Sequence, residues 1–231
     1  MDFNSLNLCQ PLLDALDEIG YISPTPIQAK AIPDLIEGRD MLGCAQTGTG
    51  KTAAFTLPIL DAITKDPWMG TRRIRTLILC PTRELASQIH DNIEQYARHL
   101  DIRSMAMFGG VSQHPQEKIL RRGVDILVAT PGRLLDLISQ GYVDLSYVQF
   151  LVLDEADRML DMGFIRDIRK ILAQIPKKRQ SLLFSATIPH SIAELSRDML
   201  YNPVSVSITP ESTTVEAVSY THLTLPTILL V

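Results

Sequence analysis

The strongest constraint on the fold is a regular alternation between two kinds of segment. Short apolar runs bounded by turn residues predict buried strands, and the longer segments between them have helical spacing. Strands that alternate with helices predict a parallel sheet with crossover helices, so we expect an α/β fold with a doubly wound, mostly parallel sheet and helices on both faces. The predicted strands span 40–45, 75–80, 103–108, 125–129, 148–153, 180–184 and 204–208, and the predicted helices span 26–37, 51–63, 83–100, 113–121, 133–140, 164–174 and 190–200.

Length and composition set the broad class of the protein. With 231 residues and 45% hydrophobic content, the chain fits one domain with a sizeable core, and its net charge of -4 shows no overall basic surface. A nucleic acid would therefore have to bind to local patches. Cys9, Cys44 and Cys80 are far apart in the sequence, which favours free thiols. Without an apparent signal peptide or membrane span, we expect a cytoplasmic monomer with no membrane contact.

A glycine-rich loop joins a predicted strand to a predicted helix. Its residues are Ala45, Gln46, Thr47, Gly48, Thr49, Gly50, Lys51 and Thr52. This is the context of a phosphate-binding P-loop, although Ala45 stands where a first glycine is common. Gly48 and Gly50 allow backbone N–H groups to surround phosphate, Lys51 reaches the β and γ phosphates, and the Thr52 hydroxyl binds Mg²⁺. A plain glycine-rich turn with a solvated lysine is the less favoured alternative.

An acidic cluster, Asp154-Glu155-Ala156-Asp157, directly follows a strand that we expect to neighbour the P-loop strand. Asp154 is suited to hold Mg²⁺, and Glu155 to orient or deprotonate the attacking water. Alone, the cluster is equally typical of an acidic helix N-terminus. Together with the P-loop, it predicts hydrolysis of a nucleoside triphosphate, with catalytic residues Lys51, Asp154 and Glu155.

These motifs, and those described next, occur in the order found in one family. Over about residues 2–217 the chain resembles the N-terminal RecA-like, ATP-binding domain of DEAD-box RNA helicases, most closely the bacterial RhlE-type branch. The segment 218–231 is atypical, because 223–231 is apolar and has neither helical period nor a polar face. We interpret it as an expression- or frameshift-derived tail, with an edge strand as the alternative.

The segment 20–28 resembles the Q motif of the family, with Phe3 upstream as the expected isolated aromatic. The resemblance places Phe3, Tyr21, Thr25 and Gln28 at the ATP site, with Gln28 on the adenine edge and Phe3 stacked on the base. One amide donor and one acceptor match adenine and mismatch guanine, so ATP should be preferred over GTP. Thr25 and Gln28, with Pro26 between them, also form a capping-box pattern, and the two roles can coexist.

Three further motifs follow predicted strands and resemble the RNA-backbone motifs of the family. They comprise Pro81, Thr82 and Arg83, then Gly109 and Gly110, then Thr130, Pro131, Gly132 and Arg133. Helix N-termini, glycine amides, threonine hydroxyls and arginine all donate to phosphate oxygens, which implies RNA binding without sequence preference. Thr130-Pro131 is equally typical of a helix N-cap, and Gly109-Gly110 of a turn.

The family resemblance also implies a coupling motif at Ser185 and Thr187, with Asp157 as its partner. This motif links ATP hydrolysis to strand separation in the family. Ser185 and Thr187 could instead cap the helix that starts near His190, and the sequence leaves both interpretations open.

The second RecA-like domain of the family carries an arginine finger, and no motif after Thr187 matches that domain. Because such a finger contributes roughly 10³ to 10⁵ in rate, we expect this chain alone to bind ATP weakly, hydrolyse it slowly and not unwind RNA. A different P-loop machine, such as a DNA helicase or transporter ATPase, is one alternative. A non-catalytic RNA- or partner-binding module is another, which the intact Lys51, Asp154 and Glu155 disfavour.

Overall fold

A seven-stranded sheet forms the centre of the computed structural model, which describes residues 2–208. Every neighbouring pair of strands is parallel, in the order β3-β4-β2-β5-β6-β1-β7. The strands are β1 Met41–Cys44, β2 Thr76–Leu79, β3 Ser104–Met107, β4 Ile126–Ala129, β5 Phe150–Leu153, β6 Gln180–Ser185 and β7 Val204–Ser207. The predicted parallel α/β fold is confirmed.

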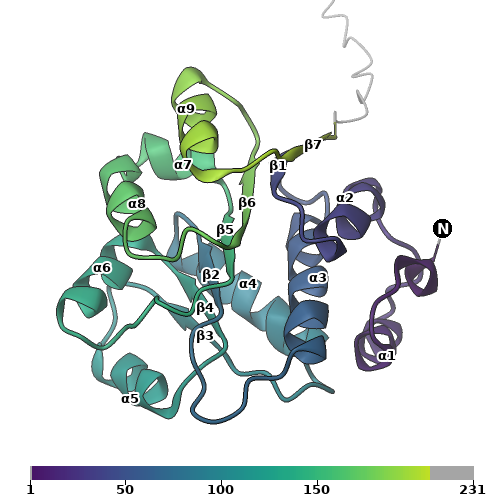
Figure 1. Cartoon of the computed structure of the whole chain (residues 1–231), viewed down its shortest axis with the longest axis horizontal. Coiled ribbons are helices and arrows are strands. Elements are labelled where there is room, and N and C mark those ends of the chain that lie inside the picture. The colour runs from purple at the N-terminus through teal and green to yellow at the C-terminus, as the bar shows by residue number, and fades with distance from the viewer. Residues whose placement is uncertain (1, 209–231) are drawn as a thin grey trace, which may run out of the picture.

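Helices cover both faces of this sheet (Figure 1). They are η1 Phe3–Leu6, α1 Gln10–Glu18, α2 Pro26–Ile36, α3 Lys51–Lys65, α4 Arg83–Tyr96, α5 His114–Arg122, α6 Pro131–Ser139, α7 Ala156–Asp161, α8 Ile165–Leu172 and α9 His190–Met199. The helices from η1 to α4 share one hydrophobic core with the sheet, and the helices from α5 to α9 share a second. In the described part of the chain, no helix has the length and apolar character needed to cross a membrane.

The central strands are apolar because both of their faces are covered. All four residues of β2 and of β4 are buried. In β1, Gly43 is required by close packing, since a Cβ atom there would overlap the ring of Phe184 on β6. The Phe184 ring in turn lies 5.4 Å from that of Phe55 on α3, so the P-loop helix is packed directly on the strands that position the loop.

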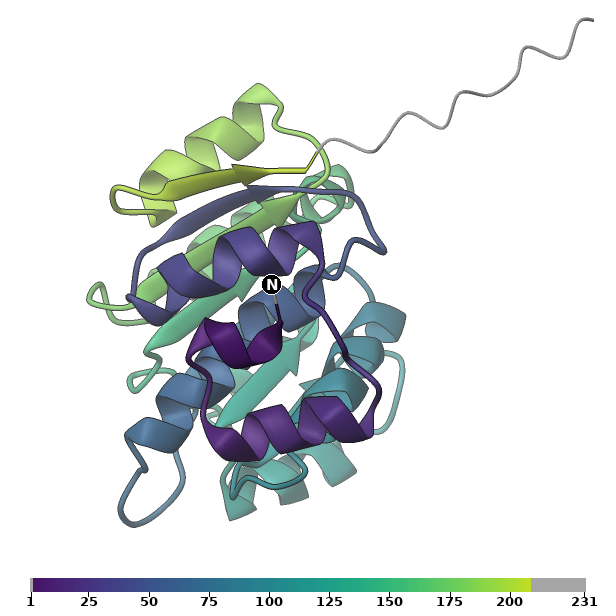
Figure 2. The same ribbon diagram turned by 90° about the vertical axis from the view of Figure 1, so that its right-hand side faces the viewer.

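The N-terminal segment forms an outer layer on α3 and α4 (Figure 2). The backbone N–H of Cys9 donates to the buried Asp61 of α3 at 2.8 Å, and Glu18 of α1 pairs with Arg98 and His99 just beyond α4. These contacts join residues about 50 to 80 positions apart in the chain. The segment that contains the predicted adenine-binding residues is therefore held against the P-loop helix.

Several predicted boundaries differ from the structure. The helix expected over 133–140 begins at Pro131, because Thr130 is extended and proline fits the first helical position. The helix expected over 83–100 ends at Tyr96, and neither α1 nor α7 was predicted. All three cysteines are free, as expected. The predicted domain boundary near 217 and the tail 218–231 lie outside the described residues.

Candidate active site

The glycine-rich loop lies between β1 and α3, as predicted. Gly48 and Gly50 both have left-handed backbone conformations, with φ of +86° and +91°. A Cβ atom on Gly50 would lie 2.6 Å from Gln28 Nε2 and 2.8 Å from Thr25 Oγ1. Glycine is therefore needed here for two reasons, its backbone angle and the close approach of the predicted adenine-binding segment.

Lys51 connects the loop to the acidic cluster. Its Nζ donates a hydrogen bond to Ala45 O at 3.0 Å and lies 3.8 Å from Asp154 Oδ1. Both side chains are buried, with 6% and 3% of their surface exposed. The expectation that the two motif strands are neighbours is wrong, because β6 lies between β1 and β5. The Lys51 ammonium nevertheless lies close to the Asp154 carboxylate.

The two carboxylates that follow β5 have different surroundings. Burial raises the pKa of Asp154 to about 6, with Lys51 opposing the shift and the charge of Glu155 adding to it. Glu155 has a left-handed backbone, with φ of +51°, and its carboxylate accepts a hydrogen bond from Thr47 Oγ1 at 3.1 Å. Glu155 is thus held beside the P-loop, while Asp154 is a desolvated anion that a nearby positive charge would stabilise.

The oxygen donors at this place fit Mg²⁺. A carboxylate and a threonine hydroxyl, from Asp154 and Thr52, line the same cavity, and Mg²⁺ commonly combines one or two carboxylates with substrate phosphates. Within residues 2–208, no group of three or more His, Cys, Asp or Glu side chains is placed to hold a metal. A magnesium ion here would therefore need phosphate oxygens or water to complete its coordination.

A cavity of about 210 Å³ lies over these groups. Of the predicted site residues, it is lined by Tyr21, Thr47, Gly48, Gly50, Lys51, Thr52, Asp154 and Glu155. Its remaining lining residues were not predicted, namely Ala53, Leu85, Gln88, Asn92 and Tyr96. Four of these five belong to α4 and recur at helical spacing, which is the signal that could have revealed them.

The predicted adenine-binding segment packs directly on the P-loop. At the start of α2, Gln28 Oε1 accepts a hydrogen bond from the N–H of Thr25 at 2.9 Å, and Gln28 Nε2 donates to Gly50 O at 3.1 Å. Thr25 Oγ1 is buried and has no hydrogen-bond partner among the described residues. The capping-box role of Gln28 is therefore present, and its amide retains one N–H and one lone pair for a ligand.

The two predicted aromatic residues lie in different places. Tyr21 lines the 210 Å³ cavity and its hydroxyl lies 3.1 Å from that of Tyr96. Phe3 is 4% exposed, packs on Tyr21 with ring centroids 6.1 Å apart, and lines a separate cavity of about 480 Å³. Direct stacking of Phe3 on a base stays a prediction.

The predicted RNA motifs begin two helices at one edge of the sheet. Thr82 Oγ1 caps α4 by accepting a hydrogen bond from Leu85 N at 3.2 Å, whereas the Thr130 hydroxyl does not cap α6. A Cβ atom on Gly110 would lie 3.9 Å from Arg83 Nη1, so the first two motifs are adjacent. Pro81 and Gly109 lie in the loops before α4 and after β3, and Gly132 lies in the first turn of α6.

Arg133 of the third motif is 13% exposed and turned toward the glycine loop. Its Nη2 donates to Val111 O at 3.2 Å, and its buried Nη1 has no partner in the described part of the chain. Arg133 thus holds the loop that carries Gly109 and Gly110, so in this structure it contacts the protein more than the solvent.

The predicted coupling residues are in contact. Asp157 Oδ2 accepts hydrogen bonds from Thr187 N at 3.0 Å and Thr187 Oγ1 at 2.9 Å, and Ser185 Oγ accepts one from Asp157 N at 3.2 Å. Burial opposes ionisation of Asp157, but its hydrogen bonds outweigh that effect and lower its pKa. The alternative role as helix caps is not seen, since Pro189 occupies the N-cap of α9.

Comparison with known proteins agrees with this arrangement. The model of the DEAD/DEAH box helicase family matches residues 25–195, which include the P-loop, the acidic cluster and the coupling motif. The chain belongs to the DEAD/DEAH box helicase family. This membership excludes the transporter ATPase considered from the sequence.

Curated relatives from this family resemble nearly all of the chain. An "ATP-dependent RNA helicase DeaD" of Klebsiella pneumoniae is 47% identical over 96% of the chain, and that of Escherichia coli (strain K12) is 46% identical over the same share. A "DEAD-box ATP-dependent RNA helicase CshA" of Streptococcus pneumoniae is 42% identical over 96%. The matches cover 34%, 35% and 42% of these relatives, so the chain spans roughly a third of their length.

Proposed function

We propose that this chain is the ATP-binding half of an ATP-dependent RNA helicase, with an N-terminal RecA-like domain over residues 1–217. The names of the curated relatives and the length that the chain shares with them support this proposal. Placement in the bacterial RhlE-type branch rests on sequence resemblance alone, whereas the relatives named above are DeaD and CshA proteins. A cytoplasmic location and a monomeric state are parts of the same proposal.

The observation that carries the proposal is the buried pair of Lys51 and Asp154 beneath an open cavity. Lys51 lies where it can exchange its hydrogen bond to Ala45 O for one to a phosphate oxygen. Gly48 and Gly50 leave backbone N–H groups at the N-terminus of α3 for the phosphate chain.

Glu155 has the position of a general base or a group that orients water. Its hydrogen bond to Thr47 keeps the carboxylate at the cavity wall, where it could accept a hydrogen bond from water. Asp154 and Thr52 are the residues that would hold Mg²⁺, which when bound neutralises charge on the phosphate oxygens. The Gln28 amide would select adenine.

RNA would bind along the edge formed by the starts of α4 and α6. Thr82, Arg83, Gly110 and Thr130 provide hydroxyl, guanidinium and amide donors suited to phosphate oxygens. A second RecA-like domain in the full-length protein would complete both sites and supply the arginine finger. On this proposal the single half hydrolyses ATP slowly and does not separate RNA strands.

Calorimetry of the 231-residue chain with ATP and with GTP, in the presence of Mg²⁺, tests this proposal. We expect selective binding of ATP, loss of binding in Lys51→Ala, and slow turnover that single-stranded RNA does not stimulate. Glu155→Gln should keep the binding and lose the residual turnover, which makes it the matched control. Equal affinity for ATP and GTP would contradict the role of Gln28, and strong RNA-stimulated turnover would contradict the need for a second domain.

A further inference from the structure

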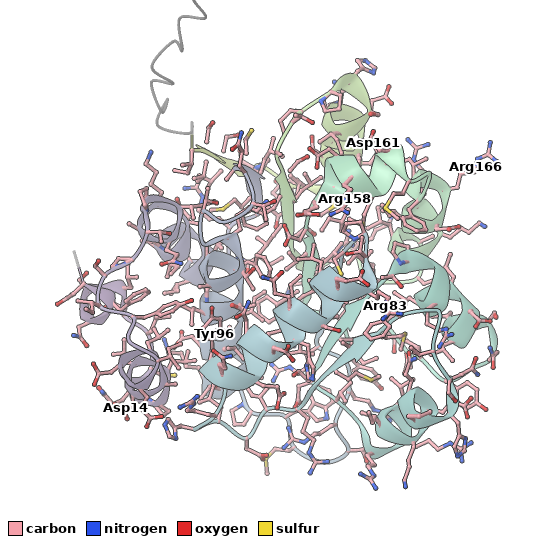
Figure 3. The ribbon with its side chains drawn as sticks, turned by 180° about the vertical axis from the view of Figure 1, so that it is seen from behind. Asp14, Arg83, Tyr96, Arg158, Asp161 and Arg166 are labelled. Carbon is pink, nitrogen blue, oxygen red and sulfur yellow. The ribbon has the colours of Figure 1, made fainter. Side chains whose placement is uncertain are left out.

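Helix α4 connects two parts of the proposed machinery. Arg83 and Tyr96 lie at its opposite ends (Figure 3). Leu85, Gln88, Asn92 and Tyr96 recur every three or four residues, so they share one face of the helix. All four line the 210 Å³ cavity together with the P-loop. This face of α4 is therefore one wall of the cavity. Its side chains are uncharged, whereas the P-loop wall carries the charge of Lys51.

Within residues 2–208, the two amides on this face have no hydrogen-bond partner. Among the described residues, the hydrogen bonds of α4 side chains involve other positions, and neither the Gln88 nor the Asn92 amide takes part. Tyr96, by contrast, lies within hydrogen-bond distance of Tyr21. Water can satisfy the amides while the cavity is open, and a ligand with hydroxyl or phosphate oxygens can replace that water.

The position of each amide along the helix indicates what it would meet. Tyr96 contacts Tyr21, which belongs to the proposed adenine-binding segment, so this end of α4 marks the adenine end of the cavity. With a helical rise of about 1.5 Å per residue, Asn92 lies roughly 6 Å and Gln88 roughly 12 Å farther toward the start of α4. The nucleoside sugar and then the phosphates follow the base in the same direction.

We propose that this face of α4 is a further binding surface of the nucleotide site, with Asn92 bound to the ribose hydroxyls and Gln88 to the phosphate chain. An amide both donates and accepts, as a ribose hydroxyl does, and its N–H group can donate to phosphate. The inference rests on the proposed ATP binding and extends it to residues outside the P-loop and the acidic cluster. It also places nucleotide contacts on the helix whose first turn carries the proposed RNA motif.

The test is calorimetry of the full chain with ATP and with 2′-deoxy-ATP, each with Mg²⁺. Asn92→Ala should weaken ATP binding about fivefold to tenfold, as expected for one lost hydrogen bond, and should abolish most of the preference for ATP over 2′-deoxy-ATP. Gln88→Ala should weaken the binding of both nucleotides by a similar factor. Gln95→Ala is the matched control, because Gln95 is exposed on the same helix and does not line the cavity.

The outcomes separate this inference from the proposed function. One outcome is that Asn92→Ala and Gln88→Ala bind both nucleotides as the parent chain does, while Lys51→Ala loses binding. That outcome overturns the proposed role of α4 in nucleotide binding and leaves the proposed ATP binding supported. If the parent chain and Lys51→Ala bind ATP equally poorly, both proposals are overturned. A melting temperature for each variant detects unfolding, and Asn92→Asp, which keeps the size but loses the donor, supplies a second test at that position.

Discussion

The Asp154 carboxylate is buried, with Lys51 Nζ 3.8 Å from its Oδ1. Its pKa of about 6 in the folded protein lies above its ordinary value of 3.8, mainly because of burial. The folded state therefore holds the proton more tightly than the unfolded state, and this group stabilises the fold less as the pH rises from about 4 to about 6. Without nucleotide, ionised Asp154 is destabilising.

We predict that Asp154→Asn stabilises the nucleotide-free chain at pH 7 by on the order of 2 to 3 kcal/mol, and by much less at pH 4. Urea denaturation of both proteins at the two pH values measures this difference. The same gain at pH 4 and pH 7 would show that the effect does not come from the ionisation of Asp154.

Gly48 and Gly50 differ in surroundings although both have left-handed backbones. Gly48→Ala meets no atom within 4 Å, so it should cost about 1 kcal/mol for the backbone angle alone. Gly50→Ala should cost about 1 to 3 kcal/mol more, because its Cβ would displace Gln28 and Thr25. Denaturation midpoints compare the two variants, and equal losses would mean that the close packing against Gln28 is not important.

At the scale of elements, α7 is tied to the end of β6 through Asp157 and Thr187. Thr187→Val removes the hydroxyl donor and keeps the backbone one, so we expect a loss of about 1 kcal/mol in the free energy of unfolding. Thr187→Ser retains the hydroxyl and should stay close to the parent. Urea denaturation near neutral pH measures both, and a loss in Thr187→Ser as large as that in Thr187→Val would contradict the role of this hydrogen bond.

Helices α1 and α7, which the sequence analysis did not predict, differ in their local signals. Helix α1 has proline in its first turn and buried residues at helical spacing, Leu12, Ala15 and Leu16, so its pattern was a signal that was missed. Helix α1 begins after Cys9, whose side chain makes no capping hydrogen bond, and it is held by Asp61, Arg98 and His99 from distant parts of the chain. Helix α7 has only 6 residues and starts after Glu155 in a left-handed conformation. The other helices from α2 to α9 were found near their true bounds.

At the scale of the whole molecule, the sheet brings the proposed ATP and RNA motifs to one edge. Parallel strands end together, so loops that are far apart in the chain meet there, and α4 extends from this edge along the cavity. The proposed nucleotide is covered by α4 and the P-loop within this half. A second domain would cover the part of the phosphate chain that these elements leave open, which is the reason to expect slow turnover from the half alone.

The sequence by itself determined the parallel α/β fold and the strand–loop–helix context of the P-loop, because local apolar period and glycines carry that information. The contact of Asp157 with Thr187 was expected only from the family resemblance. Only the tertiary structure decided that β6 separates the two motif strands, that Phe3 is buried against Tyr21, and that one face of α4 lines the cavity. The physical reason is that strand order and helix orientation depend on packing between residues far apart in the chain, which no local pattern encodes.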